Sequence, residues 1–378
     1  MASVRTRSKV RAEKALHDAQ RATLFVSTLP IAALLVLKAL VHRPELTSDG
    51  ATAGITAVVI MTFVVAGIYR CAVKLNFETN LISIFLTIST FTSACDLGIT
   101  GYLLGVWELG SFYPSHGEKY FGTAFGVACL GWDGVVHLLM QGYLCRRSLC
   151  GQKLGPIAFM WAGSVINSMI PLLLGGAATG KYSPDVEFST ALNAPYVIIP
   201  ILIAIKLMDS RTDKHVKRGA KVRSPATATL TCLIVVTHIG LIVLHVVRTM
   251  SVVGSDAPIA QRWLQKFEPS LQQNDGTNII LIQTLQSFFW LVPYHCVALW
   301  EAFSRFRYSR RSLLANAGDW AFLVTGAYLQ SCFIRFFMTV ADYQGPGQIN
   351  YELHRPTTIV TLFVCCTSML HAILMNDE

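Results

Sequence analysis

The segment GWDGVVHLLMQGYLCRR, residues 131–147, places a carboxyl group and an imidazole four residues apart inside a long apolar run. In a helix, Asp133 and His137 would lie one turn apart on the same face, and Trp132 precedes the aspartate. A carboxyl group among apolar side chains favours its neutral form, because its charge is poorly solvated there. It can then act as a general acid, and an aromatic ring can stabilise the cation made by protonating an alkene or epoxide.

Further polar residues accompany this pair. Asp96 and Asn167 fall in neighbouring apolar runs and are expected to face the same interior. We assign Asp133 as the acid and Asp96 as a second acid or base, with His137 and Asn167 orienting them and Trp132 shielding the cation. Each residue has a structural alternative, since polar side chains between membrane helices also serve as packing partners. The weaker, substrate-binding candidates of the second half are His238, His245, Trp290, His295 and Gln330.

The composition predicts an all-α polytopic membrane protein. The chain of 378 residues is 53% hydrophobic and 14% charged, with a mean hydropathy of +0.48, whereas soluble domains carry about 25% charged residues. Backbone groups in hydrocarbon must be satisfied within each segment, so the spans are expected to be helical. The ten predicted spans are approximately 24–42, 53–69, 81–105, 121–144, 155–178, 189–207, 228–250, 278–302, 319–340 and 356–375.

The distribution of lysine and arginine predicts the orientation of these spans. With both termini in the cytosol, 22 of the 31 basic residues fall on the cytosolic side and six on the opposite side, a clear positive-inside bias. This bias explains the net charge of +9 and argues against a nucleic-acid partner. Lys38 and Arg248 fall within spans and are expected to snorkel outward.

The cysteines and glycines predict neither a metal site nor a cofactor. Seven of the ten cysteines fall inside predicted spans, where they act as small apolar residues. The chain has no metal-ligand spacing and no glycine-rich phosphate loop.

A weak internal repeat divides the chain. Asp96-Leu97-Gly98 corresponds to His238-Ile239-Gly240, and Trp132 and His137 correspond to Trp290 and His295 at the same spacing. The string GSVINS at 163–168 corresponds to GAYLQS at 326–331, which pairs Asn167 with Gln330. Where the first copy has Asp133, the second has Leu291, so an acid catalyst belongs in the first copy.

The repeat predicts two tandem four-helix units after two leading helices. The predicted divisions are a basic N-terminus with two leading helices (1–75), a first unit (78–208), a basic cytosolic linker (209–227) and a second unit (228–376).

Several of these strings resemble a known family. GWDGVVHLLM with the following RR, GSVINSMIPLLLGGAATGKYSPD and DWAFLVTGAYLQ are similar to the transmembrane 6 superfamily, whose members carry two tandem EXPERA units after leading helices. The resemblance covers about residues 55–372. EXPERA proteins also include a sterol Δ8–Δ7 isomerase, which uses a His and a Glu four residues apart. Here Asp96 is followed four residues on by Thr100, and His238 by Ile242, which is a departure from that pattern.

The chain also resembles the fungal membrane-bound terpene cyclases of ascofuranone- and ascochlorin-type meroterpenoid pathways. That resemblance implies an endoplasmic-reticulum enzyme that opens a terminal epoxide on a farnesylated aromatic lipid and closes a ring. It also implies an upstream prenyltransferase and an epoxidising monooxygenase. The alternatives are a sterol isomerase and a non-catalytic protein of lipid binding or lipid homeostasis.

Overall fold

The computed structural model describes residues 2–113, 119–179, 193–212, 225–272, 279–308 and 317–340, and these ranges contain helices and no strand. The α-helices are α1 (Ala2–Val41), α2 (Gly50–Lys74), α3 (Leu81–Leu103), α5 (Ala124–Trp132), α6 (Leu138–Leu149), α7 (Pro156–Thr179), α9 (Pro195–Thr212), α10 (Pro225–Val252), α11 (Pro258–Lys266), α12 (Ile279–Tyr308) and α13 (Ala317–Val340). Three short 3-10 helices, η1 (Pro44–Thr47), η2 (Lys119–Gly122) and η4 (Pro269–Gln272), and one π-helix, η3 (Asp133–His137), complete the described part.

Within the described residues, six helical segments are long and apolar enough to cross a bilayer. They are Ala12–Val41, Gly50–Lys74, Leu81–Leu103, Ala124–Leu149, Pro156–Leu174 and Val235–Val252. Each coincides with a predicted span, so the chain is a multi-pass helical membrane protein. Helices α9, α12 and α13 fall at three further predicted spans without belonging to these six. The last predicted span, 356–375, lies outside the described residues, and the count of ten spans stays a prediction.

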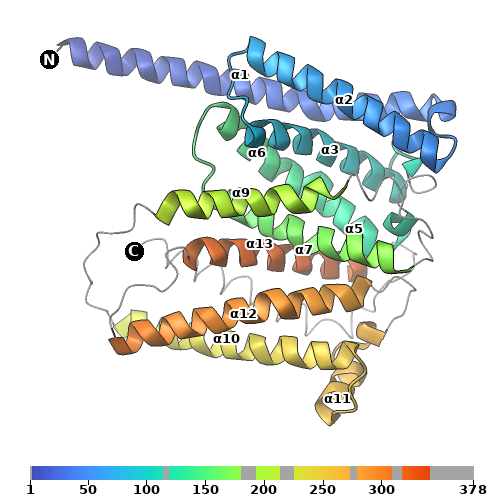
Figure 1. Cartoon of the computed structure of the whole chain (residues 1–378), viewed down its shortest axis with the longest axis vertical. Coiled ribbons are helices and arrows are strands. Elements are labelled where there is room, and N and C mark those ends of the chain that lie inside the picture. Colours follow the sequence, from blue (N-terminus) through green and yellow to red (C-terminus); the bar gives the residue numbers. More distant parts are fainter. Residues whose placement is uncertain are drawn as a thin grey trace. The chain divides into compact units, whose positions relative to one another are not determined.

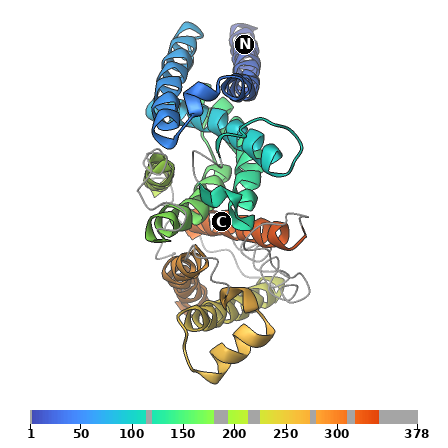
Figure 2. The same cartoon turned by 90° about the vertical axis from the view of Figure 1, so that its right-hand side faces the viewer.

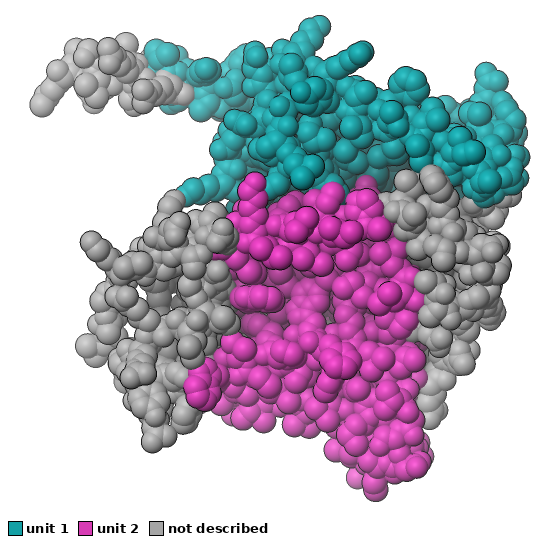
Figure 3. All heavy atoms as spheres, viewed as in Figure 1, with its two compact units in different colours: residues 1–122, 129–158 teal, residues 123–128, 159–378 magenta. Residues whose placement is uncertain are grey.

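The chain forms two compact units, which Figure 3 colours separately. Unit 1 contains residues 1–122 and 129–158, and unit 2 contains residues 123–128 and 159–378. These units are groups of residues in mutual contact. They are not the duplicated units 78–208 and 228–376, which stay a prediction from the repeat.

Small polar residues join α3 to α6 inside unit 1, where the two helices lie side by side (Figures 1 and 2). The Ser83 and Ser148 hydroxyl oxygens are 2.7 Å apart, and Thr87 Oγ1 is 3.2 Å from Cys145 Sγ. Ser93 Oγ donates to Gln141 Oε1 at 2.7 Å. Successive contacts pair a later residue of α3 with an earlier residue of α6, so the helices are antiparallel. Short side chains let these helices approach closely.

Helix α2 begins at an aspartate cap. The Asp49 carboxylate accepts hydrogen bonds from the Thr52 backbone N–H at 3.0 Å and from the Thr52 hydroxyl at 2.7 Å. These bonds favour the charged form and lower the pKa of Asp49 to about 2. The cap therefore keeps its charge, which suits the positive end of the helix dipole.

Two glycines bring α7 and α13 together in unit 2. A Cβ atom on Gly163 would collide with the Leu323 carbonyl oxygen, and one on Gly326 would collide with the Met160 carbonyl oxygen. One turn further along, Asn167 Nδ2 donates to Gln330 Oε1 at 3.0 Å. The contact advances in the same direction on both helices, so they are parallel. The approach is close enough that only glycine fits at these two positions.

An ion pair anchors the C-terminal end of α10 in unit 2. Arg248 Nε lies 2.8 Å from Glu268 Oε2, and Arg248 Nη2 lies 3.0 Å from Oε1. The Trp263 indole N–H also donates to Glu268 Oε2, at 3.1 Å. The two side chains are 12% and 2% exposed, so the expected outward snorkelling of Arg248 is wrong. The carboxylate that follows α11 holds this guanidinium in a two-pronged contact instead.

Replacing Arg248 by Lys is expected to lower the free energy of unfolding by about 1–2 kcal/mol, because a lysine cannot form both bonds to one carboxylate. Thermal and denaturant unfolding in detergent would measure the change. The matched control is Arg43→Lys, in a pair with Glu45 whose side chains are 69% and 60% exposed. An exposed pair of this kind contributes little. Equal effects of the two substitutions would contradict a stabilising role of the Arg248–Glu268 pair.

Candidate functional site

A π-helical turn positions the predicted acid. Helices α5 and α6 continue each other through η3, which consists of Asp133–His137. A π-helix inserts an extra residue per turn and is frequent at functional sites, because it redirects side chains at a cost in backbone regularity. Gly134 in this turn packs on α3, since a Cβ there would lie 2.6 Å from the Leu97 backbone nitrogen and Cα. The missing side chain allows the turn to approach α3.

Three of the predicted catalytic residues meet within this turn. Nδ1 of His137 lies 2.6 Å from Oδ1 of Asp133, although the ring N–H is not aligned for a regular hydrogen bond. On the other side of the ring, the Trp132 indole N–H donates to His137 Nε2 at 3.0 Å. The His137 side chain is 3% exposed and that of Asp133 is 17% exposed.

The indole contact identifies the proton that His137 carries. An indole nitrogen only donates, so His137 Nε2 must be the acceptor and carries no proton. A neutral imidazole has one N–H, which we therefore infer to be on Nδ1, facing the Asp133 carboxyl. Trp132 thus fixes the tautomer of His137 and orients its ring toward the acid.

Asp96 lies on α3 at the level of this turn. Its neighbour Leu97 contacts Gly134, which follows Asp133, so the two predicted carboxyl residues belong to one helix crossing. The Asp96 backbone carbonyl accepts from the Thr100 hydroxyl at 2.7 Å. Asp96 is partly exposed, as is Asp133. Unit 1 therefore brings Asp133, His137, Trp132 and Asp96 to one region.

Asn167 belongs to unit 2, and its recorded contacts are with α13. Its amide nitrogen donates to Gln330 Oε1 at 3.0 Å and to Ser331 Oγ at 3.1 Å. Asn167 is 5% exposed and Gln330 is fully buried. The repeat had aligned these two residues as counterparts, and the structure puts them in contact.

The histidines predicted in the second half form a connected chain in unit 2. His238 Nδ1 lies 2.8 Å from His295 Nδ1, and His295 Nε2 lies 2.8 Å from Tyr328 Oη. Tyr328 Oη also lies 2.8 Å from His245 Nε2. The three histidines and Tyr328 are all at most 5% exposed. Each group can donate or accept, so such a chain can pass a proton along its length.

The sequence analysis missed two tyrosines that contact these histidines. Tyr328 links two histidines, and the Tyr294 ring lies edge-on to those of His238 and His295, at 5.9 and 5.1 Å between centroids. The available signal was position: Tyr294 directly precedes His295, and Tyr328 lies in GAYLQS, two residues before Gln330. Trp290, the remaining candidate, lies on α12 and its Nε1 is buried.

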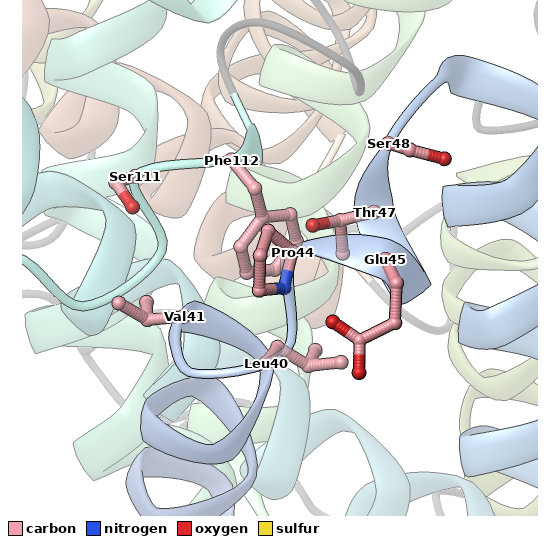
Figure 4. A pocket seen from close by; sticks show the side chains of 8 residues that line it. All are labelled: Leu40, Val41, Pro44, Glu45, Thr47, Ser48, Ser111 and Phe112. Carbon is pink, nitrogen blue, oxygen red and sulfur yellow. The ribbon is translucent and has the colours of Figure 1, made fainter.

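Unit 1 also contains a cavity of about 520 Å³ beside the connection between α1 and α2. Figure 4 shows its lining, to which Phe112 contributes an aromatic ring and Glu45 a carboxylate. None of the predicted site residues lines this cavity. Among the residues that the structure describes, no group of three or more His, Cys, Asp or Glu side chains could hold a metal ion.

These helices and buried polar groups define a polytopic α-helical membrane protein with carboxyl, imidazole and amide side chains enclosed between its helices. Residues 32–218 match the family described as Transmembrane 6 superfamily member 2-like, transmembrane domain. The matched range is just under half of the chain, and together with the relatives below it shows that the chain is similar to the transmembrane 6 superfamily. The matched range includes Asp96, Asp133, His137 and Asn167.

Two curated relatives are proteins named Transmembrane 6 superfamily member 2. The one from Rattus norvegicus is 27% identical over 266 residues, which cover 67% of this chain and 66% of the relative. The one from Homo sapiens is 26% identical over 286 residues, which cover 71% of this chain and 72% of the relative. The chain thus spans about two thirds of the length of the rat relative. No solved structure matches the chain.

Proposed function

We propose that the chain is a membrane-embedded terpene cyclase that protonates an epoxide or alkene of a prenylated aromatic lipid and guides the resulting cation into a ring. The observation that carries the proposal is the contact of Asp133 with His137, whose ring Trp132 fixes from the other side. The similarity to the superfamily and the membrane-spanning helices are compatible with a lipid substrate but do not select this reaction.

In this proposal, Asp133 is the proton donor. His137 Nδ1 lies 2.6 Å from Oδ1, so the acidic proton is assigned to the second oxygen, Oδ2. As the O–H bond of Asp133 breaks, a bond forms from the proton to the epoxide oxygen, and a C–O bond of the epoxide opens. The cation that develops at carbon is then attacked by a nearby alkene. The Asp133 carboxylate left behind is stabilised by the His137 N–H.

Asp96 is the proposed base that ends the reaction. It removes a proton from the carbon next to the final cation, and the C–H electrons form a new double bond. The product is therefore an isomer of the substrate, with no oxidant or reductant consumed. Trp132 is assigned a double role, in which its N–H positions His137 while its ring shields the cation. His137 and Asn167 are the proposed orienting residues, and the hydrogen bonds of Asn167 are made with α13.

The proposal implies two partner enzymes, a prenyltransferase that makes the prenylated phenol and a monooxygenase that makes its epoxide. It also implies residence in the endoplasmic reticulum, where lipid-soluble intermediates are accessible to all three. Both termini are assigned to the cytosol from the positive-inside bias of the sequence.

The direct test is to feed a farnesylated phenol with a terminal epoxide to microsomes that contain the full chain. We expect a new compound of unchanged mass and different retention time, identified as a ring by NMR. Microsomes without the protein provide the control, because epoxides also open without a catalyst. If the epoxide binds to the purified protein but is recovered unchanged, the cyclase proposal fails and the chain is a lipid-binding protein.

A further inference from the structure

On α12 and α13 of unit 2, three polar side-chain atoms are buried without a hydrogen-bond partner among the described residues. They are the side-chain oxygen of Gln286, the indole nitrogen of Trp290 and the side-chain nitrogen of Gln330. A buried polar group left without a hydrogen bond destabilises a protein by about 1–3 kcal/mol. Three such groups in one region therefore indicate a site that a ligand completes.

Hydrogen bonds to one turn of α7 place these atoms in a common region. Gln286 Nε2 donates to the Ile166 carbonyl oxygen at 3.1 Å, and the next residue, Asn167, donates to Gln330 Oε1 at 3.0 Å. Trp290 follows Gln286 by four residues, so it lies on the same face of α12. Figures 1 and 2 show α7, α12 and α13 side by side in unit 2.

Exchanging the oxygen and nitrogen atoms of the glutamine amides would not give these polar atoms hydrogen-bond partners. Turning the Gln286 amide would place its oxygen against the Ile166 carbonyl oxygen, which is repulsive. Turning the Gln330 amide would place two N–H groups opposite each other unless Asn167 turned too. Even then, one polar atom of Gln330 would remain without a partner. The indole of Trp290 has a single polar atom and no alternative.

The three atoms have the hydrogen-bonding pattern of one hydroxyl group. Trp290 and Gln330 each offer an N–H, and Gln286 offers an oxygen. A hydroxyl has two lone pairs for the donors and one O–H for the acceptor. A carbonyl or ether oxygen would leave Gln286 without a partner, and an ammonium group would accept from neither donor.

We propose that α7, α12 and α13 of unit 2 bind the hydroxyl group of an otherwise apolar lipid. The face of unit 2 seen in Figure 3 is hollowed between α7 and α12, which provides access for a lipid. Prenyl alcohols and sterols share the chemistry of a single hydroxyl on an apolar skeleton. The site does not depend on Asp133 or on the cyclase proposal, since its residues are in unit 2 and it requires only binding.

The test uses the purified full chain in nanodiscs with two photoreactive, alkyne-tagged probes, one derived from farnesol and the other from cholesterol. We expect at least one probe to label peptides of α7, α12 or α13 in a saturable manner, and the labelled arm identifies the source of the hydroxyl. Trp290→Phe removes one donor while leaving every protein–protein hydrogen bond of the site intact. It should raise the half-saturating probe concentration about three- to tenfold.

The matched control is Trp300→Phe, on the same helix, where the side chain is 58% exposed. It should leave labelling unchanged. On the unaltered protein, the unlabelled alcohol should compete at least about threefold better than its methyl ether, which cannot donate to Gln286. This comparison tests the proposal even if Trp290→Phe fails to fold. The proposal would be overturned by equal labelling of the Trp290 and Trp300 variants, or by equal competition from the alcohol and the ether. The absence of saturable labelling would also overturn it, because water alone would then occupy the site.

Discussion

Replacing Asp133 by Asn should abolish turnover of a farnesylated phenol epoxide, with a loss of at least about 100-fold in kcat. Asparagine has nearly the same shape and keeps an oxygen that can face the His137 N–H, so the π-helical turn should persist. It has no acidic proton to give. Product formation in microsomes, normalised to the amount of protein, measures the effect.

The matched control is the same substitution at Asp49, the exposed cap of α2, since asparagine caps helices as well as aspartate does. Asp49→Asn should retain full activity. A second variant, Trp132→Phe, separates positioning from folding, because it removes the indole N–H that fixes His137. It should lower kcat more than it changes KM. Full activity of Asp133→Asn would remove the assignment of the acid, whatever the other variants do.

Replacing Gly163 or Gly326 by Ala should each lower the free energy of unfolding by about 3 kcal/mol, the upper part of the range for overpacked sites. The added methyl group would meet a backbone carbonyl oxygen, which has no rotamer by which to move away, so α7 and α13 would have to separate. The Asn167–Gln330 hydrogen bond one turn away would be strained by the same movement. Thermal unfolding of the purified protein in detergent measures the loss.

Gly240→Ala is the control for these variants. Gly240 lies in α10 with no atom within 4 Å of an added Cβ. Alanine there should be neutral or slightly stabilising, because it favours a helix more than glycine does. The double variant of Gly163 and Gly326 should lose less than the sum of the single effects, since one separation of the helices relieves both clashes. Additive losses, or a loss at Gly240 as large as at Gly163, would contradict the close crossing.

Hydropathy predicted where the six long apolar helices lie, because a helix that spans a bilayer must be continuously apolar. It predicted helix ends less well. The first span was expected at 24–42, whereas α1 begins at Ala2. The first turns of this helix are polar, and hydropathy therefore did not indicate them. Periodicity also predicted that Asp133 and His137 share a face, since four residues make about one helical turn. The π-helical turn that joins them has no signature in residue types.

Contacts between distant segments were less accessible from sequence. The repeat aligned GSVINS with GAYLQS, yet an alignment of counterparts does not say whether they touch. The contact depends on Gly163 and Gly326, whose importance follows from the distance between the helices. Arg248 was expected to snorkel outward, since its partner, Glu268, is 20 residues away and follows a separate helix. Gln286 was not predicted as a site residue, because a single amide in an apolar run has many ordinary roles.

The crossing of α7 and α13 has a consequence for the history of the chain. Gly163 meets Leu323 and Gly326 meets Met160, so each contact is repeated with the roles of the helices exchanged. The corresponding positions differ by 163 residues throughout, as do Asn167 and Gln330. Two identical subunits related by a twofold axis meet in this way. An ancestor consisting of one four-helix unit that paired with itself would have needed the same glycine on both sides. Duplication of its gene within one chain would have let one copy have Asp133 where the other has Leu291.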